Sequence, residues 1–174
     1  MKRFFIAAAI LLSIGSFKTY AQNINSDASF VEFSISNMKF KTVEGTFKGM
    51  KGEVKFDIDD LVNSSMNVCI SSASVNTGNE KRDEHLRKDD FFNCEKYPDI
   101  CFKSTSITKE ENGFIVSGEM SLHGITKQVE IPFNYSNNTF KGSFKINRKD
   151  YGVGGNGTFM VGDEVTLNIT CKIE

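Results

Sequence analysis

The sequence has no tryptophan, two prolines, two histidines and no excess of basic charge. Its 21 Lys and Arg residues face 22 Asp and Glu residues, so the net charge of -1 gives none of the basic surface that nucleic-acid binding needs. The longest apolar run, residues 4–14, is far shorter than the roughly 20 residues of a membrane-spanning helix. Together these features exclude a nucleic-acid-binding protein and predict no transmembrane segment.

Motifs for catalysis and metal binding are also missing. No glycine-rich loop leads from a strand into a helix, and the sequence has no Cys-x-x-Cys pair, His-x-x-x-His pair or G-x-S-x-G motif. The acidic residues Asp57, Asp59 and Asp60 lack the spacing of a calcium-binding loop. His85 and His123 lie in unrelated contexts, and exposed positions account for both. The sequence therefore predicts neither an enzyme nor a metal or cofactor site.

Phenylalanine, in contrast, is abundant, with 16 residues in a chain of 174. A ring without a hydrogen-bond donor belongs in a core or against an apolar ligand. Three of these residues, Phe4, Phe5 and Phe17, fall in a stretch that has a basic start, an apolar run and small residues at its end. This arrangement predicts a cleaved signal peptide over residues 1–21, followed by a single domain over 22–174 that is periplasmic or secreted.

From Ser29 onward, apolar residues recur at every second position, which is typical of strands with one buried face. Residues 31–35 and 165–169 are clear examples. Turn sequences such as His123-Gly124 and Asn137-Asn138 separate the runs at intervals of about ten residues. The pattern predicts eight or nine short antiparallel strands that form either a two-layer sandwich or a barrel, and the alternation does not distinguish the two.

One stretch departs from the alternation. Thr77-Gly78-Asn79-Glu80 matches the capping box that begins many helices, and Asp83 precedes Arg87 by four positions in the charged run that follows. These features predict one short surface helix near 79–90. Because Leu86 is its only apolar residue, the helix must be held by the body on which it lies.

The four cysteines are Cys69, Cys94, Cys101 and Cys171, an even number that permits three full disulfide pairings in a secreted chain. Strand parity places Cys69 and Cys101 on outward positions and Cys171 on an inward one. A bridge between Cys69 and Cys101 is therefore feasible if their strands are neighbours. Four free thiols remain the alternative, and the spacing fits no zinc module.

A long series of motifs runs through the domain: Ser74-Val75, Thr77-Gly78, Arg82-Asp83, His85-Leu86, Phe91-Phe92, Tyr97-Pro98, Phe102-Lys103-Ser104, Gly118 to Lys127 and Arg148 to Gly152. This series closely resembles the YceI family of bacterial polyisoprenoid-binding proteins over nearly all of residues 28–170. Members of that family are secreted, lipocalin-like antiparallel β-barrels that enclose a long isoprenoid or similar lipid tail.

The resemblance implies a β-barrel of about eight strands rather than a sandwich, with a lipid or isoprenoid as its partner and no cofactor. The expected function is that of a carrier or reservoir for a polyisoprenoid, a quinone or a similar long apolar chain. The alternative is a filled barrel that acts as a stress-response or protein-interaction module. The oligomeric state stays open between a monomer and a homodimer.

Inward parity and the resemblance together predict the residues that line the barrel, although inward phenylalanine is also ordinary core. The predicted lining residues are Phe33, Phe47, Phe56, Val68, Ile70, Leu86, Phe91, Phe102, Phe114, Met120, Leu122, Phe133, Phe140 and Phe144. Arg82, Asp83 and His85 are expected either to fix the helix on the barrel or to contact a lipid head group. Histidines common in the family are replaced here by Ala28 and Asn37, which predicts a different head-group preference or a closed pocket.

Overall fold

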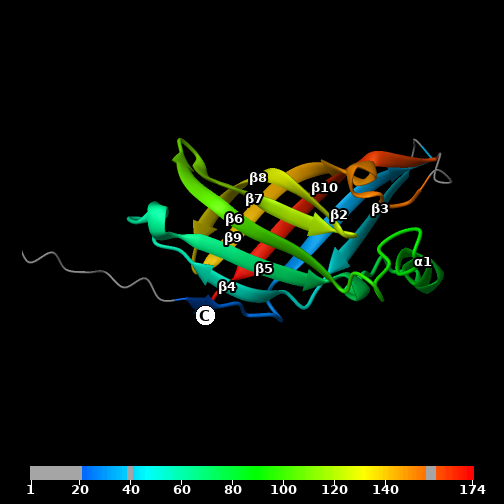
Figure 1. Ribbon diagram of the computed structural model, residues 1–174, viewed down its shortest axis with the longest axis horizontal. Helices are drawn as coiled ribbons and strands as arrows, with labels where there is room; N and C mark the ends of the chain where they lie inside the picture. The colour runs from blue at the N-terminus through cyan, green and yellow to red at the C-terminus, as the bar shows by residue number, and fades with distance from the viewer. Residues whose placement is uncertain (1–20, 39–40, 156–159) are drawn as a thin grey trace, which may run out of the picture.

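A single antiparallel sheet holds most of the chain in the computed structural model, which describes residues 21–38, 41–155 and 160–174 (Figure 1). Residues 1–20 of the predicted signal peptide lie outside the described residues. The described strands are β1 (Gln22–Asn23), β2 (Phe30–Asn37), β3 (Lys41–Phe47), β4 (Lys51–Lys55), β5 (Ser65–Ser71), β6 (Asp99–Glu110), β7 (Gly113–Leu122), β8 (Ile125–Ser136), β9 (Thr139–Asn147) and β10 (Val161–Lys172).

The sheet curls strongly, in the order β1-β4-β5-β6-β7-β8-β9-β10-β2-β3 (Figure 1). Ile24 forms an isolated bridge with Ile173, so the chain just after β1 reaches the end of β10. The free edge of β3 meets the chain after β5 through a second bridge, between Thr46 and Asn76. The predicted all-β, lipocalin-like architecture is confirmed, as a strongly curled half-barrel.

The sheet has ten strands within the described residues, and the expectation of about eight was therefore too low. The alternation missed β1 because two residues are too few to show a period. It also missed β3, in which Gly45 occupies the position between Val43 and Phe47 where an apolar side chain would have marked the buried face. A glycine on that face breaks the pattern without breaking the strand.

The predicted helix is present but shorter than 79–90, since α1 spans Glu80–Leu86. Its N-cap is Asn79, whose side chain accepts a hydrogen bond from the Arg82 backbone N–H at 3.1 Å. Thr77 does not cap the helix; its backbone N–H donates instead to the buried Asp83 carboxylate at 2.9 Å. Among the described residues there are also three short 3-10 helices: η1 (Leu61–Asn63), η2 (Ser72–Ser74) and η3 (Arg148–Tyr151).

A disulfide joins Cys69 on β5 to Cys101 on β6, where the two residues lie opposite each other in register. Their sheet face is the outward one, because the neighbouring Asn67 and Lys103 on the same parity are exposed. Cys94 and Cys171 are free thiols. Burial raises the pKa of Cys171 to about 11, against a smaller lowering by a hydrogen bond with Ser29, so this thiol stays protonated at neutral pH.

The aromatic core gathers at the end of the barrel that holds the β8–β9 turn. We call this cluster the aromatic plug; it consists of Phe56, Phe114, Phe133, Tyr135 and Phe140. The Phe56 ring lies 4.9 to 5.9 Å, centroid to centroid, from each of the other four rings, in edge-on arrangements that aromatic pairs prefer. No helix in the part of the chain that the structure describes has the length and apolar character to cross a membrane.

Candidate functional site

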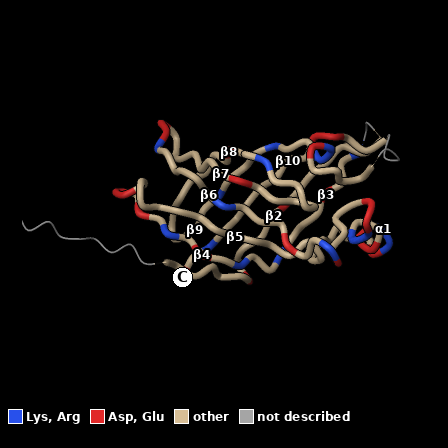
Figure 2. Tube along the Cα trace, in the orientation of Figure 1, with Lys and Arg blue, Asp and Glu red and all other residues tan. Residues whose placement is uncertain are grey.

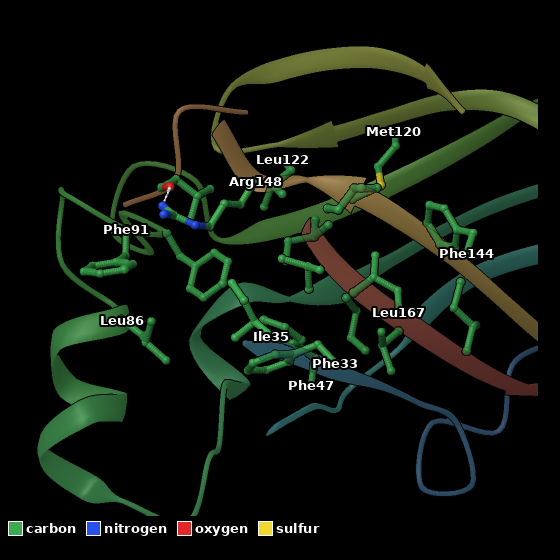
Figure 3. A pocket seen from close by; sticks show the side chains of 18 of the residues that line it. Phe33, Ile35, Phe47, Leu86, Phe91, Met120, Leu122, Phe144, Arg148 and Leu167 are labelled. Carbon is green, nitrogen blue, oxygen red and sulfur yellow. Dashed lines mark hydrogen bonds between the residues drawn. The ribbon is translucent and has the colours of Figure 1, made fainter. Parts of the chain in front are cut away.

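An apolar cavity of about 530 Å³ occupies the half of the barrel nearer to α1 (Figure 3). Its walls are the inward faces of β2, β3 and β5 to β10, and the α1 side is bordered by Leu86 and by Phe91 and Phe92 just after the helix. Ten of the fourteen predicted lining residues border it: Phe33, Phe47, Val68, Ile70, Leu86, Phe91, Phe102, Met120, Leu122 and Phe144.

The other four predicted lining residues do not border the cavity. Phe56, Phe114, Phe133 and Phe140 belong to the aromatic plug, where each side chain is between 4% and 7% exposed. Parity was a correct guide to which face of the sheet they occupy. Parity does not indicate how far along the barrel axis a residue lies. That position decides whether a ring borders the cavity or belongs to the aromatic plug.

Aliphatic residues that the sequence-based set omitted supply much of the remaining wall. They carry the same inward parity as the residues that were included, so the alternation itself was the signal for them. These residues are Val31, Ile35, Val43, Ile100, Ile131, Ile146, Val165, Leu167 and Ile169.

The boundary between the cavity and the plug falls at a common level on adjacent strands. On β8, Ile131 lines the cavity and Phe133, two residues on, belongs to the plug. On β9 the cavity-lining residue is Phe144 and the plug residue is Phe140. The barrel interior is therefore divided into a filled half and an open half.

Two glycines let large rings lie flat against the wall of the open half. A Cβ atom added to Gly45 on β3 would overlap the ring of Phe33 on the adjacent strand β2. A Cβ added to Gly118 on β7 would lie 2.7 Å from the ring carbon Cζ of Phe102 on β6. Because both glycines lack a side chain, the rings cover backbone rather than crossing the bore.

Arg148 lies at the edge of the pocket (Figure 3), and its side chain is almost fully buried. Its guanidinium donates to the carbonyl oxygens of Gly162 and Val153, each at 2.7 Å, and to Asp163 Oδ1 at 3.0 Å. These bonds tie η3 to the start of β10. Sequence reasoning did not select Arg148, although it opens one of the motifs on which the family resemblance was based.

Of the three predicted head-group residues, Arg82 and His85 border the cavity and Asp83 does not. Asp83 is buried and accepts hydrogen bonds from both the backbone N–H and the hydroxyl of Thr77. Its position matches the structural role, fixing the chain before α1. Asn37 also borders the cavity.

Arg82 is held by the same threonine. Its Nε donates to Thr77 Oγ1 at 2.7 Å, and one terminal nitrogen donates to the Thr77 carbonyl oxygen at 3.0 Å. Within residues 21–38, 41–155 and 160–174, no ion pair joins Arg82 to a carboxylate. The guanidinium thus has a fixed position beside the cavity and a positive charge without an ion-pair partner among those residues.

The two histidines occupy different environments. His85 Nε2 lies 2.9 Å from Asp90 Oδ2, with both side chains half-exposed, and its ring meets Phe91 edge-on. His123 is half-buried rather than exposed as expected, because its Nδ1 lies 3.1 Å from the Tyr151 carbonyl oxygen. Burial, with a smaller contribution from Asp150, raises the pKa of the Tyr151 hydroxyl.

Comparison with known proteins relates this geometry to named relatives. A family model for the YceI-like domain matches residues 22–173. UPF0312 protein plu2095 of Photorhabdus laumondii is 34% identical over 157 residues, which cover 83% of this chain and 82% of the relative. Protein YceI of Escherichia coli O157:H7 is 32% identical over 158 residues, covering 84% of this chain and 83% of the relative.

Solved structures agree with the sequence comparison. The crystal structure of Burkholderia cenocepacia BcnA has a TM-score of 0.80 at 26% identity and covers 85% of this chain and 98% of that protein. A polyisoprenoid binding domain from Saccharophagus degradans has a TM-score of 0.67 at 17% identity, over 88% of this chain and 98% of that domain, a likeness of fold alone. From the family match, the identities above 30% and the shared fold, we conclude that the chain belongs to the YceI-like family.

Proposed function

We propose that this protein binds an amphiphile whose long apolar chain lies in the barrel cavity while its head group stays at the α1 end. The cavity of about 530 Å³ is the observation that carries this proposal. Protein interiors are normally close-packed, with few voids larger than a water molecule. A space this large falls in the range of small-molecule pockets, and its apolar wall suits a hydrocarbon chain.

The energetics favour strong binding of an apolar chain by the cavity, with little selectivity for the head group. Each buried methylene contributes about 0.8 kcal/mol, so roughly 15 of them supply about 12 kcal/mol before the costs of association are subtracted. The hydrophobic effect is non-directional, so the wall selects the shape of the chain more than its chemical identity. An isoprenoid, a quinone tail or a comparable chain meets this requirement.

The polar residues of α1 that border the cavity are the candidates for contacting the head group. Arg82, held by Thr77 and without an ion-pair partner among the described residues, is the candidate for binding an anionic group, with His85 next to it. The name of the Saccharophagus degradans domain records polyisoprenoid binding by that protein. At 17% identity it supports the proposal through the fold alone.

The biological setting of the proposal is a carrier or reservoir in the periplasm or outside the cell, after removal of residues 1–21. Binding is non-covalent, and the protein requires no cofactor for it. The alternative, a filled barrel that acts only through its outer surface, requires side chains across the whole interior. The aromatic plug fills one half, and the cavity in the other half weighs against that alternative.

Solvent extraction of the purified protein under denaturing conditions, followed by mass spectrometry, tests the proposal together with binding of a fluorescent apolar probe. Leu167, in the cavity wall opposite Phe33 and Phe144 on the neighbouring strands, provides a blocking variant. We expect Leu167→Trp to weaken probe binding at least tenfold. Asn168→Trp, on the exposed face of the same strand, is the matched control and keeps wild-type binding. Absence of both extracted lipid and probe binding in the wild type would refute the proposal.

A further inference from the structure

The aromatic plug lies behind the inner end of the cavity. Phe56 follows β4, Phe114 begins β7, Phe133 lies near the end of β8 and Phe140 begins β9, so four separate elements contribute rings to the plug. Phe114 and Phe133 face each other in register and stack with centroids 5.2 Å apart. A chain that advanced past the cavity would have to separate these rings.

The barrel between the cavity and the plug is also filled. Val116 on β7 pairs with the cavity-lining Ile131, and Ile107 on β6 pairs with Val116. Val116 and Ile107 are at most 6% exposed, and neither borders the cavity. A second hollow reaches the plug at Phe114 and Phe133, but its border is rich in polar and charged residues and does not suit a hydrocarbon chain. The depth available to a ligand ends at the plug.

The volume of the cavity limits how many carbon atoms of a ligand the barrel can enclose. If a methylene needs about the volume that a water molecule occupies in the liquid, roughly 30 Å³, then a cavity of about 530 Å³ holds about 18 carbon atoms. This corresponds to three or four isoprene units. Carbons beyond that number find no apolar wall and stay outside the barrel.

We propose that the aromatic plug acts as a chain-length limit, so that the barrel encloses about 18 carbon atoms of its ligand and gains nothing from longer chains. This inference rests on the proposed function and adds to it the size of the chain. The ligand class is a single-chain amphiphile with about 15 to 20 carbons, and the rings of Phe56 and Phe133, packed behind the inner end of the cavity, determine that specificity.

A series of primary alcohols from 10 to about 24 carbons, competing with the fluorescent probe on the wild-type protein, measures the limit. Each fully buried methylene strengthens binding by about fourfold, the equivalent of 0.8 kcal/mol. We expect the affinity to rise steeply up to about 18 carbons and then to change less than about twofold per added pair of carbons. An affinity that continued to rise steeply to 24 carbons would overturn the limit.

Variants of the plug test its cause. Phe56→Leu and Phe133→Leu each free roughly 25 Å³, about the volume of one methylene, and each should move the plateau up by about one carbon. Ile169→Phe, in the cavity wall near the boundary, adds the same volume and should move the plateau down by about as much. Phe30→Leu is the matched control: it makes the same change on β2 at a residue that borders neither the plug nor the cavity, and it leaves the plateau in place.

The outcomes separate the limit from the proposed function. A plateau that stays at the same length in all three variants would mean that the plug does not set it. If the plug variants lose their thermal unfolding transition, Ile169→Phe alone still decides the question. If no alcohol of any length binds to the wild type, the proposed function fails and the limit fails with it; if alcohols bind without a plateau, only the limit fails.

Discussion

At the scale of single residues, Arg82 and Asp83 are adjacent in the sequence and share a hydrogen-bonding partner, but they have different roles. Both are bonded to Thr77, but Asp83 is buried beneath the helix and Arg82 borders the cavity. A guanidinium whose position is already fixed loses less side-chain entropy when it binds an anion. Arg82 is therefore suited to a carboxylate or phosphate head group.

We expect Arg82→Gln to weaken binding of a fatty acid about fivefold and to change binding of the alcohol of equal chain length less than twofold, because only the acid carries a charge. Competition at low and high ionic strength measures both affinities. Arg87→Gln is the matched control, since Arg87 bonds to the carbonyl oxygens of Ala73 and Val75 and does not border the cavity. Equal weakening of acid and alcohol would instead assign Arg82 a structural role.

At the scale of elements, the Cys69–Cys101 bridge links two strands that the β-ladder already pairs. The bridge closes a loop with a sequence separation of 32, which contains η2 and α1. Because α1 has little apolar surface of its own, the bridge limits the freedom of the unfolded chain around the least self-sufficient part of the molecule.

Replacing both cysteines, Cys69→Ala with Cys101→Ala, should lower the free energy of unfolding by about 3 to 4 kcal/mol, the chain-entropy cost expected for a loop of this length. Urea unfolding of the oxidised wild type and the double variant measures the difference. Cys94→Ser serves as the control, because Cys94 is free and only partly buried. An unchanged midpoint in the double variant would show that the bridge contributes nothing to stability.

The elements also show what sequence reasoning could reach. Alternation predicted the strands that present several apolar side chains in a row, and the family resemblance selected a barrel over a sandwich. The alternation did not predict the two-residue strand β1 or the glycine-interrupted strand β3. The helix was predicted, but the capping-box pattern pointed to Thr77 as its N-cap, whereas the N-cap is Asn79. The pattern alone does not determine which nearby side-chain oxygen accepts the hydrogen bond from the first backbone N–H groups of the helix.

The candidate site was predictable to a similar depth. Phe102 and Phe114 both lie on inward parity, yet one lines the cavity and the other fills the barrel. The difference depends on strand register and on the tilt of each strand around the barrel, which arise from pairings between residues far apart in the chain. The glycines opposite Phe33 and Phe102 have the same origin and could not be paired with their rings from the sequence.

At the scale of the whole molecule, the barrel combines a self-sufficient core with an open site. The filled half buries its aromatic rings against one another without any ligand. The open half leaves apolar wall facing empty space, so fewer contacts oppose its local opening. The helix α1, which carries both acidic and basic residues, also lies at this open end (Figure 2).

Hydrogen exchange should resolve the two halves. In the ligand-free protein, we expect the backbone N–H groups of Val116 and Phe133 to exchange most slowly and that of Ile35 to exchange faster, because the former lie in the filled half. A bound apolar chain should slow exchange at Ile35 and Leu167 and leave Val116 nearly unchanged. Equal slowing at all four positions would show that the barrel opens as one cooperative unit.

The glycines opposite Phe33 and Phe102 have an evolutionary consequence. At Gly45 an added methyl group would meet the Phe33 ring, and at Gly118 it would meet both the Phe102 ring and the backbone of β6. The position of each ring therefore depends on a residue that contributes no side chain. We expect any lineage that keeps these two rings against the wall to keep both glycines as well, so a substitution at either position marks a barrel whose interior is packed differently.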